Sequence, residues 1–236
     1  MMYITRNLIL ITPFFIISIP FVIIHRILEI KKRQYLGIKT TSYKEVGVIS
    51  LMYSLILIGI VTFGTSINFF DIQYIAQHIN ESIKNINFIP FKGMIEFGVH
   101  GFINIFGNIF IFMPFGFCAA LLSRKEKKIK HIVLVGIGIS LGIEIIQIFI
   151  VRSSDINDLI LNTLGTFLGL SLLNLFEKYF PDFVYKFTIN KPKNEVTIKN
   201  NRKINIITIL QIAIWITLLV NLRDIAMGFY QFKFLK

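Results

Sequence analysis

The sequence contains few charged residues for its length. Of its 236 residues, 16% are charged and 54% are hydrophobic. A water-soluble domain needs more polar side chains than this to cover its surface. The composition therefore excludes an ordinary soluble domain and predicts an integral membrane protein.

Cysteine and histidine are also scarce. The single Cys118 lies in an apolar run, so it cannot form an internal disulfide and is expected to pack like a small apolar residue. No Cys/His spacing is typical of a zinc site. His100, beside an apolar run, is interpreted as a residue of the membrane interface. We predict no metal and no cofactor.

Catalytic motifs are missing as well. No Ser–His, Cys–His, His–carboxylate or phosphate-loop pattern occurs, so no catalytic residue can be assigned. Carboxylates beside an arginine could still perform acid–base chemistry on a lipid head group. A membrane-embedded hydrolase or transferase therefore remains an alternative, although the sequence does not indicate an enzyme.

The net charge of +12 does not indicate nucleic-acid binding. Most of the 25 Lys and Arg residues lie in short connections between apolar runs, as in cytoplasmic loops of membrane proteins. The richest connections are those before residue 46, between 122 and 132, and after 176. If these connections lie in the cytoplasm, both termini lie on the extracellular side of the plasma membrane.

Six apolar runs are long enough to cross a bilayer, which needs about 20 helical residues. They are residues 8–28, 46–66, 101–122, 132–151, 157–176 and 204–222. We predict an all-α polytopic transmembrane bundle of about six spans. Residues 1–45 form a first span with a basic loop, 46–176 a core, and 177–236 a cytoplasmic connection with a last span. If 204–222 only lies on the membrane, the C-terminus is cytoplasmic.

The long connection from about 68 to 100 contains a helical repeat of isoleucines. The repeat comprises Ile72, Ile75, Ile79, Ile83 and Ile86, with polar residues largely elsewhere. This pattern predicts an amphipathic helix lying on the outer membrane surface; a solvated loop helix is the alternative. Residues 87–91, which include Pro90, are expected to break that helix and lead the chain back to the membrane.

Polar side chains interrupt three apolar runs at similar distances from the outer surface. Each run carries a pair on one helix face, at i,i+4 or i,i+3 spacing. The pairs are Asn104 and Asn108, Glu144 and Gln147, and Asp158 and Asn162. Unpaired polar groups cost several kcal/mol in hydrocarbon, so we expect these pairs to share one site. Short connections make the three helices antiparallel neighbours.

Glycine and proline residues in these helices are interpreted as packing positions. Gly165 and Gly169 continue the face of Asp158 and Asn162, and such small residues let helices approach closely. Pro114 and Gly116 are expected to break the regularity of the 101–122 helix near mid-membrane.

A positive charge lies beside the predicted pocket. Arg152 follows the apolar run that carries Glu144, and Asp155 and Asp158 follow it closely. Arg152 could pair with a carboxylate or bind a phosphate through its planar guanidinium. The predicted ligand-binding residues are Asn104, Asn108, Glu144, Gln147, Arg152, Asp155, Asp158 and Asn162. The alternative is a self-satisfied polar network that only holds the helices together.

Four motifs together resemble the VanZ-like family of bacterial membrane proteins. They are N-F-I-P-F at 87–91, N-I-F-G-N-I-F-I-F-M-P-F-G at 104–116, E-I-I-Q at 144–147 and R-S-S-D-I-N-D-L-I-L-N-T-L-G at 152–165. The resemblance covers roughly residues 45–176. It implies a protein of the Gram-positive cell envelope and a part in teicoplanin resistance, with which the family's founding member is associated, without a settled reaction. The richness in Ile, Lys and Asn suits a low-GC Gram-positive source.

The sequence and the resemblance together give a hypothesis of function. The polar pocket would bind a membrane lipid, a lipid-linked cell-wall intermediate or a lipoglycopeptide, and so reduce the access of a glycopeptide antibiotic to its target. Transport is disfavoured, because the inner halves of the three helices look apolar. The oligomeric state is not indicated.

Overall fold

The computed structural model describes residues 2–35, 40–63, 72–92, 98–123, 129–150 and 153–187. For residues 2–15, 72 and 98–100 it describes the backbone alone. The predicted last span, 204–222, lies outside the described residues, and so does Arg152.

All regular elements in these ranges are helices. They are α1 (Met2–Tyr35), α2 (Ser42–Phe63), α3 (Ile72–Lys84), α4 (Gly98–Leu122), α5 (Ile129–Phe149), α6 (Ile156–Tyr179) and α7 (Pro181–Lys186). The prediction of an all-α fold is confirmed for this part of the chain.

Four of the described helices are long and apolar enough to cross a membrane. These candidate spans are Ser42–Phe63, Gly101–Leu122, Ile129–Phe149 and Ile156–Tyr179. They correspond to four of the six predicted spans, and α1 covers a fifth predicted run without being among them. The chain is therefore a helical membrane protein, and the number of six spans stays a prediction.

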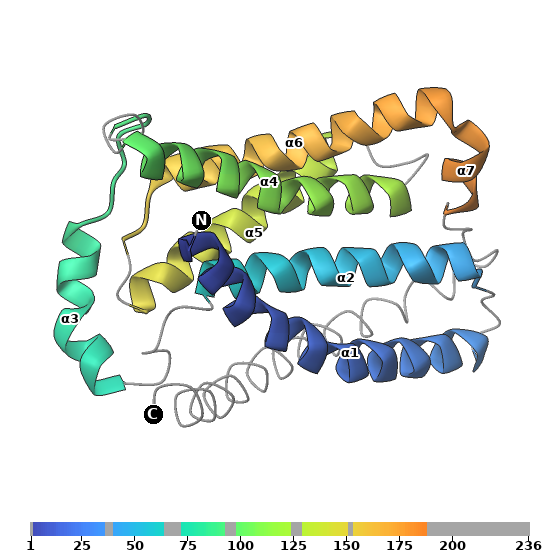
Figure 1. The fold of residues 1–236 in the computed structure, drawn as a ribbon, viewed down its shortest axis with the longest axis horizontal. Coiled ribbons are helices and arrows are strands. Elements are labelled where there is room, and N and C mark those ends of the chain that lie inside the picture. The colour runs from blue at the N-terminus through green and yellow to red at the C-terminus, as the bar shows by residue number, and fades with distance from the viewer. Residues whose placement is uncertain are drawn as a thin grey trace. The chain divides into compact units, whose positions relative to one another are not determined.

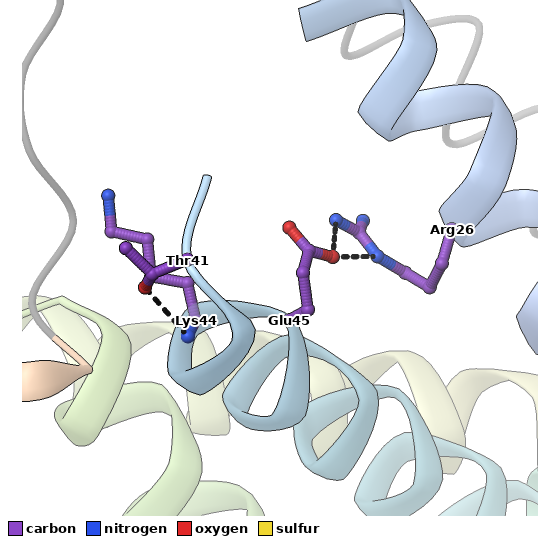
Figure 2. Close-up of polar contacts among 4 residues, drawn as sticks. All are labelled: Arg26, Thr41, Lys44 and Glu45. Atoms are coloured by element: carbon purple, nitrogen blue, oxygen red, sulfur yellow. Dashed lines mark hydrogen bonds and ion pairs between the residues drawn. The ribbon is translucent and has the colours of Figure 1, made fainter. Parts of the chain in front are cut away.

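The chain divides into two compact units. The terminal unit comprises Met1–Glu45 and Asn190–Lys236, and the core unit comprises Val46–Ile189. In the terminal unit, Arg26 of α1 donates from Nε and Nη2 to Oε2 of Glu45, over 3.0 and 2.6 Å (Figure 2). The Thr41 hydroxyl accepts a hydrogen bond from the Lys44 amide at the start of α2. A buried pair of opposite charges of this kind becomes costly when one partner is removed.

In the core unit, α4 and α6 lie side by side, and α5 contacts both (Figure 1). Glycines allow the close approach of α4 and α6. A Cβ atom on Gly165 would collide with the Ile109 carbonyl oxygen, and one on Gly169 with the Met113 carbonyl oxygen. Such backbone-to-backbone packing is typical of small-residue seams in membrane helices.

A second close contact centres on Thr166 of α6, which is fully buried. A Cβ on Gly116 of α4 would collide with the Thr166 carbonyl oxygen, and one on Gly136 of α5 would lie 2.6 Å from the Thr166 hydroxyl oxygen. Helix α4 continues through Pro114, which is exposed, so the expected break does not end the helix.

The described residues of the core unit include two apolar clusters. One comprises Ile58, Phe112, Phe115 and Ile143. The other comprises Ala120, Leu121, Ile132, Leu170, Leu173, Val184 and Phe187, near the end of α6 and α7. Many large apolar side chains elsewhere on α4, α5 and α6 are exposed, as expected for surfaces that face lipid.

The amphipathic segment is a helix, as predicted. It forms α3, whose Ile83 is exposed and whose Ser82 is buried. Figure 1 shows α3 at the end of the core unit where α4 and α6 begin, and α3 contacts α5. Its position on the outer membrane surface stays a prediction.

Candidate functional site

Two asparagines of α4 converge on one carboxylate of α6. The side-chain amide of Asn108 donates to Oδ1 of Asp158 over 2.6 Å, and that of Asn104 donates to the same oxygen over 3.3 Å. Their i,i+4 spacing puts both amides on one face of α4. Asn104 is exposed, whereas Asn108 and Asp158 are half-buried. The pair of donors therefore joins α4 to the first turn of α6.

Glu144 is the most deeply placed carboxylate of the cluster, with 6% of its surface exposed. Its Oε2 accepts a hydrogen bond from the Ser154 hydroxyl at 2.8 Å and another from the Asp155 amide at 2.9 Å. These contacts connect the last turns of α5 to the segment before α6. Such bonds are stronger when the carboxyl group is ionised than when it is neutral.

Asp155 is the N-cap of α6. Its Oδ1 accepts from the Asn157 amide over 2.9 Å and from the Asn87 side-chain amide over 2.9 Å. A carboxylate at this position satisfies a backbone N–H that has no partner within the helix and interacts favourably with the helix dipole. Asp155 was predicted as a ligand-binding residue. In the structure its side chain caps the N-terminus of α6.

Residues 87–92 are fastened to the start of α6 by main-chain bonds. Asn87 forms an isolated parallel bridge with Asp155: its amide donates to the Ser154 carbonyl, and its carbonyl accepts from the Ile156 amide, both over 3.0 Å. The buried Asn157 side chain accepts from the Phe91 amide over 2.6 Å and donates to the Lys92 carbonyl over 3.1 Å.

Asn162 lies one turn beyond Asp158 and is 4% exposed. Its side-chain amide donates to the hydroxyl of Ser140, a fully buried residue of α5, over 2.9 Å. The Asn162 carbonyl accepts from the Thr166 hydroxyl over 3.0 Å. Asn162 thus connects the polar cluster to the tightly packed centre of the unit.

Three buried oxygens have no hydrogen-bond partner among the residues that the structure describes. These unpartnered oxygens are Oε1 of Glu144, Oε1 of Gln147 and Oδ1 of Asn162. Leaving a buried acceptor unsatisfied costs about 1–3 kcal/mol, and more for a charged group. The cluster is therefore incomplete as a hydrogen-bonded network within the described chain.

Among the described residues, the predicted polar side chains of α4, α5 and α6 form two groups of hydrogen bonds. Asn104 and Asn108 meet Asp158, whereas Glu144 meets the segment that leads into α6. Of the residues predicted to be structural, Pro90 lies exposed in the turn before α4, and the others lie in the helices described above.

Four contributing residues were not singled out individually from the sequence: Ser140, Ser154, Asn157 and Thr166. Ser140 precedes Glu144 by four residues, so its place on the polar face could have been found from helical spacing. Among the described residues, no three His, Cys, Asp or Glu side chains are grouped for metal binding.

These features define a helical membrane protein with a buried carboxylate and amide cluster at one end of its core unit. Residues 50–177 match the VanZ/LLP1 family, so the chain belongs to the VanZ-like family, as its four motifs predicted. Protein VanZ of Enterococcus faecium is 38% identical over 117 residues, which cover 47% of this chain and 66% of that protein. The alignment thus spans just under two thirds of this relative. No solved structure matches the chain.

Proposed function

We propose that this VanZ-like protein contributes to protection against glycopeptide antibiotics of the teicoplanin type. In this proposal it binds a lipid-linked or amphiphilic molecule in a polar pocket of α4, α5 and α6, and so reduces the access of the antibiotic to its target. Membership of the VanZ-like family and the similarity to protein VanZ support this direction.

The observation that carries the proposal is the set of unpartnered oxygens. Glu144, Gln147 and Asn162 each keep a buried oxygen without a partner in the described chain. A network that served only to hold helices together would be expected to satisfy its own acceptors, because buried polar groups are nearly always paired. A bound ligand or water supplies the missing partners in this proposal.

The chemistry of these atoms indicates what the ligand presents to them. All three oxygens are hydrogen-bond acceptors, so the complementary ligand groups are donors such as hydroxyl, amide or ammonium groups. Sugar and amine groups of a lipid-linked cell-wall intermediate, a lipid head group or a lipoglycopeptide meet this requirement. Arg152 stays a sequence-based prediction as the group that holds a phosphate.

The arrangement of the helices supports access from a lipid leaflet. Asp155 and Asp158 lie at the start of α6, and Figure 1 shows that α4 and α6 begin at the same end of the core unit. From the distribution of Lys and Arg in the sequence we expect this end to face outward. In the proposal the pocket therefore opens to the outer leaflet, where cell-wall intermediates and glycopeptides meet.

Antibiotic protection tests the proposal in a teicoplanin-susceptible Gram-positive host that expresses the protein. In Glu144→Gln, the amide oxygen can still accept from Ser154 and Asp155, while its NH₂ group replaces an acceptor by a donor. Gln147→Leu removes a second acceptor with little change in volume. Both variants should lower the inhibitory concentration of teicoplanin toward that of the host alone.

Matched controls come from α3, where the same residue types are exposed. Glu81→Gln and Gln77→Leu change the same chemistry outside the cluster and should leave protection unchanged. Membrane immunoblots establish equal expression of all variants. Full protection by both Glu144→Gln and Gln147→Leu at normal expression would contradict the proposal and leave the network with a structural role.

Lipid extracts from the same strains separate binding from catalysis. A hydrolase or transferase would be favoured by a lipid species that appears or disappears when the protein is expressed. In Glu144→Gln, the amount of this species should return to that of the host without the protein. Identical lipid profiles, together with lost protection in the variants, favour binding.

A further inference from the structure

Four consecutive apolar residues form an exposed turn between α3 and α4. Phe88 is 74% exposed, Ile89 57% and Phe91 69%, and Pro90 between them is also exposed. Two large aromatic side chains and an isoleucine in contact with water would be unfavourable, since burying each is worth about 1.5–3 kcal/mol. The turn therefore requires an apolar environment from outside the described chain.

The turn is held rigidly, which distinguishes it from a free loop. The Asn87 bridge to Ser154 and Ile156 fixes its start, and the Asn87 side chain accepts from the Ile89 amide over 3.2 Å. The buried Asn157 holds its end through the Phe91 amide and the Lys92 carbonyl. The apolar side chains are thus presented in a fixed direction.

The backbone of Phe91 adds to this evidence. Its φ is 65°, in the left-handed region that bulky residues rarely adopt. Such a conformation costs on the order of 1–3 kcal/mol and persists only where the surroundings enforce it. Here the Phe91 amide is held by the 2.6 Å bond to Asn157, while the side chain of Phe91 is exposed.

The position of the turn indicates which environment covers it. The residues that hydrogen-bond to the turn, 154–157, lie at the start of α6. Helix α6 is long and apolar enough to span the membrane. The turn consequently lies at the depth where a membrane span starts, which is the boundary between lipid and water. On α4, Phe102, Ile103 and Phe106 are also exposed.

We propose that residues 88–91 form a lipid anchor that inserts into the boundary between acyl chains and head groups. Phe and other large apolar side chains bury themselves at this depth in segments that lie in the membrane interface. The exposed Lys92 follows directly and is suited to the head-group region. Because Asn87 and Asn157 connect the anchor to the start of α6, it fixes the height of the polar cluster relative to the leaflet. This proposal does not depend on the ligand of that cluster.

Tryptophan fluorescence tests the anchor directly. The sequence has one tryptophan, at position 215. In a Trp215→Phe background, the variant Phe88→Trp therefore contains a single tryptophan, at position 88. The purified full chain is reconstituted in phosphatidylcholine and phosphatidylglycerol vesicles, with either ordinary or brominated acyl chains. The control places tryptophan at Gln77, an exposed polar position of α3.

The anchor predicts a blue-shifted emission for Phe88→Trp and loss of most of its intensity in brominated vesicles, with little quenching by aqueous iodide. Gln77→Trp should show the reverse. Equal quenching by brominated lipid at the two positions, or emission from position 88 that iodide quenches fully, would overturn the proposal. In that case the turn faces water or a protein partner.

A nitroxide label gives the same depth information if the tryptophan variant does not fold. Cys118 is the single cysteine, so a Cys118→Ser background accepts Phe88→Cys as the only label site. Greater collision with oxygen than with a water-soluble nickel complex supports insertion, and the opposite ratio refutes it.

Discussion

The side-chain amide of Asn108 lies 2.6 Å from Oδ1 of Asp158 and joins the middle of α4 to the first turn of α6. The contact spans 50 residues of sequence, and both residues belong to apolar membrane-spanning helices. Such a bond between neighbouring helices lowers the cost of placing these two polar side chains in apolar helices.

Replacing Asn108 by leucine should destabilise the core unit. The change removes the shorter of the two bonds to a half-buried carboxylate, and such losses cost about 1–3 kcal/mol. Asn104→Leu should cost less than about 1 kcal/mol, because its bond is 3.3 Å long and exposed. Thermal unfolding in detergent, followed by size-exclusion chromatography of the soluble fraction, measures both. An equal or larger effect at Asn104 would show that the two bonds have been ranked wrongly.

A methyl group at Gly169 should separate α4 from α6. Its Cβ would collide with the Met113 carbonyl oxygen and lie 2.8 Å from the Phe117 amide nitrogen, and rigid backbone cannot move aside as a side chain can. Gly169→Ala should lower the free energy of unfolding by about 1–3 kcal/mol or more. The same unfolding assay applies.

Gly138→Ala on α5 is the matched control for this change. No atom lies within 4 Å of a Cβ at Gly138, so alanine should be neutral or stabilising by up to about 1 kcal/mol. Equal destabilisation by both alanines would mean that the α4–α6 seam is not the cause.

One side-chain oxygen of Asp155 accepts two hydrogen bonds, so replacing Asp155 by alanine should lower stability more than replacing it by asparagine. Asp155→Ala removes the acceptor for both Asn157 and Asn87, and loss of an N-cap alone costs about 0.5–2 kcal/mol. Asp155→Asn keeps an acceptor oxygen at the same place and should retain most of the stability. Proteolysis between α3 and α4 measures the release of the turn, which should quicken in the alanine variant. Indistinguishable cleavage of the two variants would argue against a capping role.

Much of the helical framework could be predicted from the sequence, because apolar runs and helical spacing act locally. The i,i+4 spacing of Asn104 and Asn108 placed them on one face. It could not identify Asp158 rather than Glu144 as their acceptor, since that depends on how closely α4 and α6 pack. This distance is set by Gly165 and Gly169 against the backbone of α4.

The turn at residues 87–92 shows a different limit of sequence reasoning. Asn87 and Asp155 are 68 residues apart, and no local pattern predicts that they pair. Asp155 was interpreted as a ligand-binding residue because it closely follows Arg152, with which it could pair. The structure adds an N-cap role that depends on the start of α6, and ligand binding by Asp155 stays a prediction.

Lipid and antibiotic binding by the purified protein tests the central claim most directly. Native mass spectrometry would compare the intact chain with Glu144→Gln and Glu81→Gln, each released from the same detergent after incubation with teicoplanin or with lipids extracted from the host. The account predicts that the intact chain and Glu81→Gln retain a bound amphiphile that Glu144→Gln loses. Equal retention by all three proteins, or no retained molecule in any of them, would contradict a ligand site at the unpartnered oxygens.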